Sequence, residues 1–107
     1  MATMPKMDFT QELHTLETAH TQHRADGAFD QAAQVREQQV ELFIARHLLR
    51  PAVDYSVGAG NDWMHHARML RRSWRMQEAD DARQQAITAY VLAIELELTP
   101  PPPPAPR

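Results

Sequence analysis

Residues 27–42, GAFDQAAQVREQQVEL, decide the fold because they contain the signal that ends one helix and the residues that begin the next. Gly27 follows Asp26, and glycine is the residue that most readily adopts the left-handed conformation after a helix. Ala32 and Ala33 then supply a contact of small residues, which lets two helices approach closely. The stretch therefore predicts the turn and the second helix of a helical hairpin.

The two helices of this hairpin are predicted over residues 8–26 and 29–49. Asp8 can cap the first helix, with Gln11 three residues later as in a capping box. Apolar residues and two histidines follow at four-three spacing: Phe9, Leu13, Leu16, His20 and His23. The second helix carries apolar residues over a sector so broad that we expect burial against more than one neighbour.

Two further helices are predicted over residues 61–77 and 80–98. Proline disfavours helical geometry in the preceding residue and lacks a backbone donor, so residues 51–60, PAVDYSVGAG, are interpreted as a loop. Asn61 or Asp62 can cap the third helix. Its expected core stripe is Trp63, Ala67, Leu70 and Trp74, and the expected inward residues of the fourth helix are Ala82, Ala86, Ala89, Tyr90, Ala93, Ile94 and Leu96. No glycine or proline marks the turn between them, so one long bent helix is the alternative.

These elements predict an all-α fold in which two antiparallel helical hairpins form a small four-helix bundle. A chain of 107 residues supports one domain, here a flexible N-terminus (1–7), a helical domain (8–98) and a Pro-rich tail (99–107). The tail, TPPPPPAPR, cannot continue a helix and is expected to be a disordered polyproline segment.

The composition argues against several classes of chemistry. The chain has no cysteine, which excludes disulfides, thiolate zinc sites, iron–sulfur clusters and cysteine nucleophiles. Ser56 and Ser73 are the only serines and neither lies in a nucleophile elbow, while residues 57–60, VGAG, lack the lysine of a phosphate-binding loop. We therefore expect no enzymatic activity and no cofactor. The lack of a long apolar run predicts a soluble, cytoplasmic protein without a membrane segment.

The hairpin resembles a known motif over residues 13–42. A helix ends in Arg24-Ala25-Asp26-Gly27, and the next helix carries Phe29-Asp30-Gln31-Ala32-Ala33, then Val35-Arg36-Glu37 and Leu42. This order resembles the UVR motif, the antiparallel helical hairpin of excision-repair subunits and of some Clp-ATPase-associated proteins. The resemblance implies a protein-binding module. Arg36 and Glu37 would lie at the edge of the hairpin, available for ion pairs within it or with a partner.

The same turn is also similar to that of a tetratricopeptide repeat, whose glycine-x-aromatic-Asp-Glu-Ala pattern resembles residues 27–32. Arg36 and Gln39 depart from that repeat, which has an aromatic residue and an alanine there, and a generic hairpin is the third interpretation. Both resemblances imply binding to another protein. The leading hypothesis is a small intracellular adaptor or regulator, with a phage- or plasmid-type inhibitor of a host complex as a special case. The sequence does not distinguish a monomer from a homodimer.

Four arginines form the strongest electrostatic feature of the sequence. They recur at helical spacing in the third predicted helix: Arg68, Arg71, Arg72 and Arg75. This arginine face could bind phosphate or an acidic protein surface, which makes a nucleic-acid-binding regulator the alternative function. The net charge of −3 argues against a general nucleic-acid coat. The other interpretation is a solvated face paired with acids such as Glu78 and Asp80.

A helical di-metal site is a more distant alternative. Glu17-x-x-His20 and Asp62-x-x-His65 imitate the carboxylate-x-x-His spacing of such sites. Helical di-iron sites normally use glutamate in both pairs, however, and a helix-capping Asp62 would not reach the centre of a bundle. The candidate ligands are therefore Glu17, His20 and His65, and we predict no metal.

Overall fold

The computed structural model describes residues 8–100, which fold into four helices and no strand. They are α1 (Phe9–Ala25), α2 (Phe29–Ala45), α3 (Leu49–Arg72) and α4 (Met76–Leu98), joined by three-residue turns at 26–28, 46–48 and 73–75. The prediction of an all-α fold with four helices is thus confirmed, and the third and fourth helices are separate. The predicted N-terminus (1–7) and most of the Pro-rich tail (101–107) lie outside the described residues.

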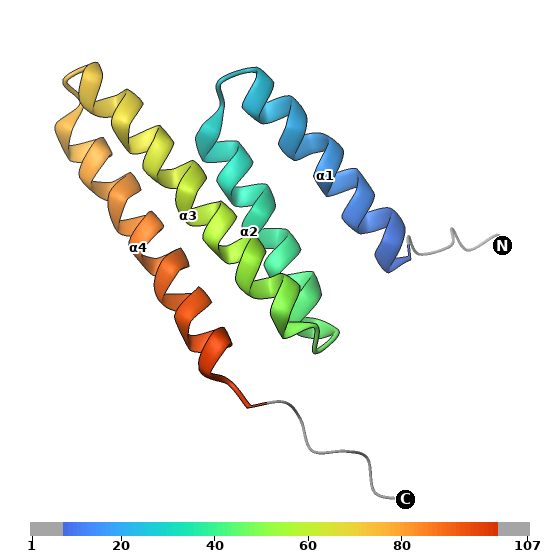
Figure 1. The fold of residues 1–107 in the computed structure, drawn as a ribbon. Helices are drawn as coiled ribbons and strands as arrows, with labels where there is room; N and C mark the ends of the chain where they lie inside the picture. Colours follow the sequence, from blue (N-terminus) through green and yellow to red (C-terminus); the bar gives the residue numbers. More distant parts are fainter. Residues whose placement is uncertain (1–7, 101–107) are drawn as a thin grey trace, which may run out of the picture.

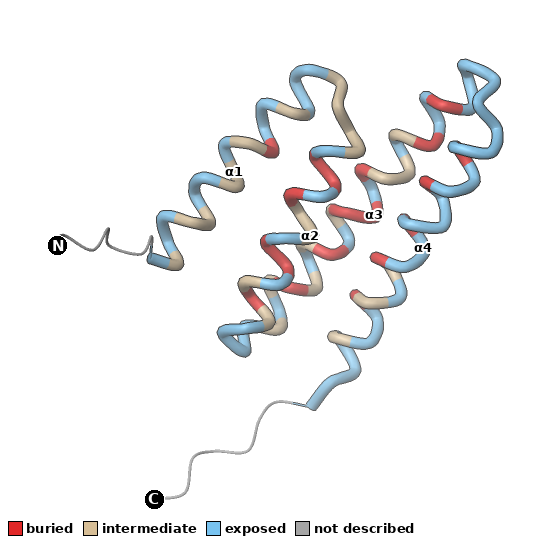
Figure 2. Tube along the Cα trace, turned by 180° about the vertical axis from the view of Figure 1, so that it is seen from behind, coloured by how far each residue is buried: buried red, intermediate tan, exposed pale blue. Residues whose placement is uncertain are grey.

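The helices form an open row in the order of the sequence (Figure 1). Extensive packing joins α1 to α2, α2 to α3, and α3 to α4, so α1 and α4 lie at opposite edges. Buried residues gather on α2, on α3 and on the side of α4 that faces α3 (Figure 2). The broad apolar sector of the second helix is explained by this arrangement, because α2 has a neighbour on each side.

The first hairpin forms as its local sequence predicts. The backbone N–H of Gln11 donates to the Asp8 carboxylate at 2.8 Å, and the Gln11 side chain accepts from the Asp8 N–H at 3.3 Å, which completes the capping box. Gly27 has a φ of 74°, the left-handed conformation expected in the turn. Short-range signals therefore determine where α1 begins and where the chain turns into α2.

The prediction of a loop over residues 51–60 is wrong, because α3 already begins at Leu49 and runs through them. Pro51 lies in the first turn of α3, where a backbone N–H would have no partner within the helix, so its missing donor costs nothing there. The turn is instead at 46–48, with His47 at a φ of 57°. Asp62, predicted to cap a helix, lies in the middle of α3.

Small residues make up most of the buried positions of α3 and α4. The buried ones are Ala52, Ser56, Ala59, Gly60 and Ala67 on α3, and Ala79, Ala82, Ala86, Ala89 and Ala93 on α4. The Ser56 hydroxyl donates to the backbone carbonyl of Ala89 at 2.7 Å. A Cβ added to Gly60 would lie 2.5 Å from the Tyr90 ring, so this glycine serves close helix packing rather than a chain break.

Candidate functional site

A buried polar cluster joins α1 to α3 across the row. Asp62 of α3 has a side chain only 2% exposed. Its Oδ2 lies 2.8 Å from Nε2 of His20, and its Oδ1 accepts a hydrogen bond from Nη1 of Arg24 at 3.0 Å. Because both carboxylate oxygens are satisfied by groups on α1, the cluster fixes the edge helix relative to α3.

A second polar cluster joins α1 to α2. The Arg36 guanidinium donates to both oxygens of Glu17, at 2.6 and 3.2 Å, and the Gln39 amide donates to the same carboxylate at 3.0 Å. The hydrogen bonds from Arg36 hold the pKa of Glu17 below its usual value, against the opposing effect of partial burial. The Tyr55 ring packs 4.7 Å from the Arg36 guanidinium. The hydrogen bonds to Glu17 join α1 to α2, and the Tyr55 ring joins this cluster to α3.

The structure places the predicted partner-binding pair Arg36 and Glu37 in contacts within the chain. Arg36 bonds Glu17 inside the first hairpin, which is one of the two uses expected from the sequence. The Glu37 carboxylate accepts a hydrogen bond from Nε1 of Trp63 at 3.2 Å. Both side chains therefore help to join α2 to its neighbours.

The three candidate metal ligands are divided among different contacts. Glu17 bonds Arg36, His20 contacts Asp62, and His65 stacks on Phe29 with ring centroids 3.8 Å apart. Within residues 8–100 no group of three His, Cys, Asp or Glu side chains is placed to hold a metal ion. Asp62 is buried rather than at an exposed helix cap, so that expectation is wrong.

The arginine face is divided by the turn between α3 and α4. Arg68, Arg71 and Arg72 are exposed on α3 and form no ion pair among the described residues. Arg75 occupies the N-cap position of α4 and is paired with Glu78, to which its Nε donates at 3.0 Å. Three of the four predicted side chains thus remain on one helix.

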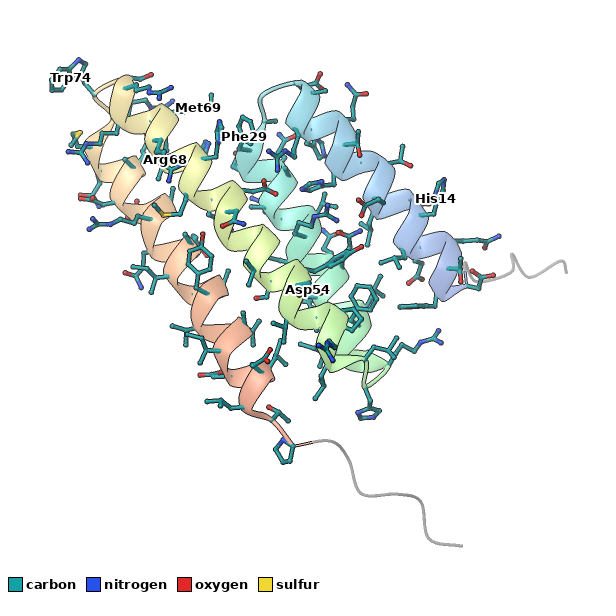
Figure 3. All side chains as sticks on the ribbon, viewed as in Figure 1. His14, Phe29, Asp54, Arg68, Met69 and Trp74 are labelled. Carbon is teal, nitrogen blue, oxygen red and sulfur yellow. The ribbon has the colours of Figure 1, made fainter. Side chains whose placement is uncertain are left out.

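Trp74 is not part of the core stripe predicted for the third helix. It lies in the turn with a φ of 60°, and 85% of it is exposed. Figure 3 shows it projecting beyond the end of the row. The prediction fails because α3 ends at Arg72, whereas a helix to residue 77 would have turned the indole inward. A non-glycine residue in this conformation is uncommon.

The outer side of α4 carries large aliphatic residues. They lie at four-three-four spacing, between 45% and 77% exposed, and are termed here the α4 outer face: Ile87, Val91, Ile94 and Leu98. Ile94, predicted to point inward, is 60% exposed, so that prediction is wrong. α4 carries two apolar stripes, and the alanine stripe is the one that packs on α3. The outer stripe could also have been predicted from the sequence, because its residues have the same helical spacing as the alanine stripe.

The opposite edge of the row is polar. The outer residues of α1 recur at similar helical spacing and are all exposed: Thr10, His14, Thr18 and Thr21. Figure 3 shows His14 pointing away from the row. The large exposed apolar residues among those described include none from α1 or α2. The two edges therefore differ: α1 ends the row with a polar surface, whereas α4 leaves an apolar one.

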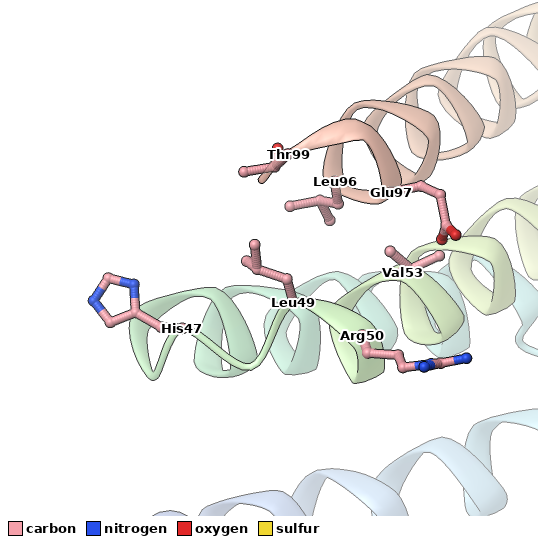
Figure 4. Close-up of a pocket in the computed structure, with 7 residues that line it drawn as sticks. All are labelled: His47, Leu49, Arg50, Val53, Leu96, Glu97 and Thr99. Carbon is pink, nitrogen blue, oxygen red and sulfur yellow. The ribbon is translucent and has the colours of Figure 1, made fainter. Parts of the chain in front are cut away.

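Two grooves adjoin the C-terminal half of α4. One, with a volume of about 440 Å³, is lined by a mixed set of residues (Figure 4): His47, Leu49, Arg50, Val53, Leu96, Glu97 and Thr99. The other, of about 370 Å³, lies between α3 and α4 and is mostly apolar: Val53, Val57, Tyr90, Ala93, Ile94, Glu97 and Leu98. The second groove is continuous with the α4 outer face through Ile94 and Leu98.

Comparison of the sequence with protein families and with curated proteins, and of the fold with solved structures, finds no match. Among the described helices, none combines the length and the apolar character needed to cross a membrane.

Proposed function

We propose that the chain is a small protein–protein interaction module, an adaptor or regulator, and that it docks through the α4 outer face. The observation that carries this proposal is the row of exposed aliphatic side chains on an edge helix. Contiguous apolar patches on soluble domains mark interaction surfaces more often than isolated exposed residues do. The helical spacing of the stripe suits another helix lying alongside α4.

The packing of the row supports this mode of binding. Each helix buries an apolar face against the next, and α4 has such a face with no neighbour among the described residues. Arrays of stacked helices need a polar outer surface where they end, and α1 has one. A helix bound to α4 would extend the row by one member and bury the exposed stripe.

The proposal is tested by thiol labelling in this cysteine-free chain. Val91→Cys places a thiol on the α4 outer face, and Thr18→Cys places one on the outer side of α1. In a lysate of the source cells, at nanomolar concentration of the chain, a docked partner should slow maleimide labelling at residue 91 relative to the purified chain. Labelling at residue 18 should not change.

A second candidate function, binding of nucleic acid, is favoured by the end of the row near the α3–α4 turn. Arg68, Arg71 and Arg72 are exposed there, and Trp74 presents its ring to solvent. Guanidinium groups bind phosphates, and exposed aromatic rings stack on unpaired bases. We rank this candidate lower because the net charge of the chain is −3.

The double variant Arg71→Glu with Arg72→Glu tests this second candidate. If the arginines bind phosphate, the wild-type chain is retained on heparin or single-stranded DNA at low salt, and the variant flows through. Both positions are exposed, so circular dichroism should show the same fold and melting temperature. Flow-through of the wild-type chain at low salt would eliminate nucleic-acid binding through this surface.

A further inference from the structure

We propose that the helix covering the α4 outer face is α4 of a second copy of the chain, packed antiparallel about a two-fold axis. This inference rests on the proposed function only in taking the α4 outer face as a docking surface, and it names the occupant of that surface. Three observations carry it: the spacing of the aliphatic stripe, the distribution of charge beside the stripe, and the apolar groove that adjoins it.

The stripe is complementary to itself when two copies run antiparallel. Residues spaced four, three and four apart form the seam of two helices packed side by side. In a two-fold antiparallel pair centred on the stripe, Ile87 lies opposite Leu98 of the second copy, and Val91 lies opposite its Ile94. Every layer of the seam then joins two large aliphatic side chains, and the isologous contact closes as a dimer.

The charges beside the stripe favour the antiparallel direction. Arg83, Tyr90 and Glu97 are seven residues apart and share one flank of α4. Burial raises the pKa of Tyr90, and the charge of nearby Arg68 opposes that rise, which places Arg68 beside the same flank. The flank is therefore basic toward Arg68 and Arg83 and acidic at Glu97.

An antiparallel second copy would bring opposite charges together along this flank. Glu97 of one copy lies level with residue 88 of the other, between Tyr90 and Arg83. The offset from Arg83 is five residues, or about 7.5 Å along a helix, which the two long side chains can span. The ion-pair partner of Arg83 among the described residues is Asp80 at 3.9 Å, an exposed contact of little strength. A parallel two-fold pair would bring this flank beside the opposite flank of the second copy, so Glu97 and Arg83 would not meet.

The groove between α3 and α4 can accommodate side chains from α4 of the second copy. Val57 is 39% exposed there, next to Ile94 and Leu98 of the stripe, and the groove holds about 370 Å³. It lies on the same flank as Tyr90 and Glu97. Apolar side chains from the N-terminal half of the second stripe, Ile87 and Val91, would lie nearest to it.

The contact is small, and this sets the expected affinity. The stripe covers twelve residues, about 18 Å of helix. A contact along so short a helix buries less surface than the roughly 800 Å² per partner of a standard interface. We therefore expect reversible association, with a dissociation constant on the order of micromolar.

Sedimentation equilibrium of the full chain tests the proposal. The wild-type chain should change from monomer to dimer between about 1 and 300 µM. Ile94→Glu should raise the dimer dissociation constant at least about 100-fold, because it buries a carboxylate in the seam. It should leave the circular dichroism spectrum unchanged, since residue 94 is already 60% exposed. Thr18→Glu, on the outer side of α1, is the matched control and should dimerise as the wild type does.

A charge exchange tests the antiparallel direction. Arg83→Glu alone and Glu97→Arg alone should each weaken the dimer several-fold, and the double variant should recover most of the loss. A monomeric wild-type chain at about 300 µM, or a dimer unaffected by Ile94→Glu, would overturn the proposal. So would a double variant that dimerises no better than the single ones.

The outcome is separable from that of the proposed function. A monomeric chain whose residue 91 is protected in lysate at nanomolar concentration would refute the second copy and support docking on another protein. A dimer without such protection would support the second copy and refute the adaptor role.

Discussion

Gly60→Ala should lower the free energy of unfolding by about 1 to 3 kcal/mol, because the added methyl group would overlap the Tyr90 ring at 2.5 Å. The gain in helix propensity from alanine, roughly 0.5 to 1 kcal/mol, opposes this cost but is smaller than a clash in the closely packed α3–α4 contact. The Tyr90 ring cannot easily yield, since its hydroxyl donates to Asn61 at 2.6 Å. Thermal denaturation followed by circular dichroism would measure a melting temperature lowered by roughly 5 to 15 °C.

Gly58→Ala is the matched control, with the same substitution two residues away on the same helix. Its Cβ would meet the Arg36 side chain at 3.8 Å, an ordinary contact, so alanine should raise stability by about 0.5 to 1 kcal/mol. Opposite signs at the two glycines are the expected result. If Gly60→Ala were neutral or stabilising, close packing against Tyr90 would not explain the glycine. If the Tyr90 ring is the cause, Tyr90→Ala should reduce the cost of Gly60→Ala in the double variant.

Asp62→Ala should destabilise the chain by about 2 to 4 kcal/mol, because it leaves the buried His20 ring without its acceptor. Arg24 also loses a partner, although half of its side chain is exposed and the loss there is smaller. Urea denaturation of the variant would measure this difference. Asp62→Asn, which keeps the shape and one carbonyl acceptor, should cost less.

Asp54→Asn is the control for this position, since Asp54 is an exposed aspartate on the same helix and should change stability by less than about 0.5 kcal/mol. Equal effects at residues 54 and 62 would mean that the link between α1 and α3 contributes little. The orientation of the α1 edge would then rest on apolar packing alone.

The parts of this fold that follow from the sequence are those with short-range causes. The capping box at Asp8 and Gln11 and the left-handed Gly27 each involve residues within one turn of a helix. The start of α3 could not be read in the same way. A proline such as Pro51 disrupts the interior of a helix but is accepted in the first turn of one. Pro51 could therefore either end the second helix or begin the third, and the position of the turn at 46–48 decides for the third.

The candidate site depends more on distant contacts. Gly60 is explained by Tyr90, thirty residues later, and Asp62 by His20 and Arg24, which lie 42 and 38 residues earlier. The α4 outer face could have been predicted from the sequence, because Ile87, Val91, Ile94 and Leu98 have helical spacing. The alanine stripe of the same helix also has that spacing, and hydrophobicity alone does not tell which stripe is buried.

Protection of residue 91 from thiol labelling tests directly whether a different protein docks on the α4 outer face. The measurement compares maleimide labelling rates of Val91→Cys and Thr18→Cys, each in source-cell lysate and as dilute purified chain. Docking of such a protein should slow labelling in lysate at residue 91 and leave labelling at residue 18 unchanged. Equal rates in lysate and buffer at both residues would contradict it.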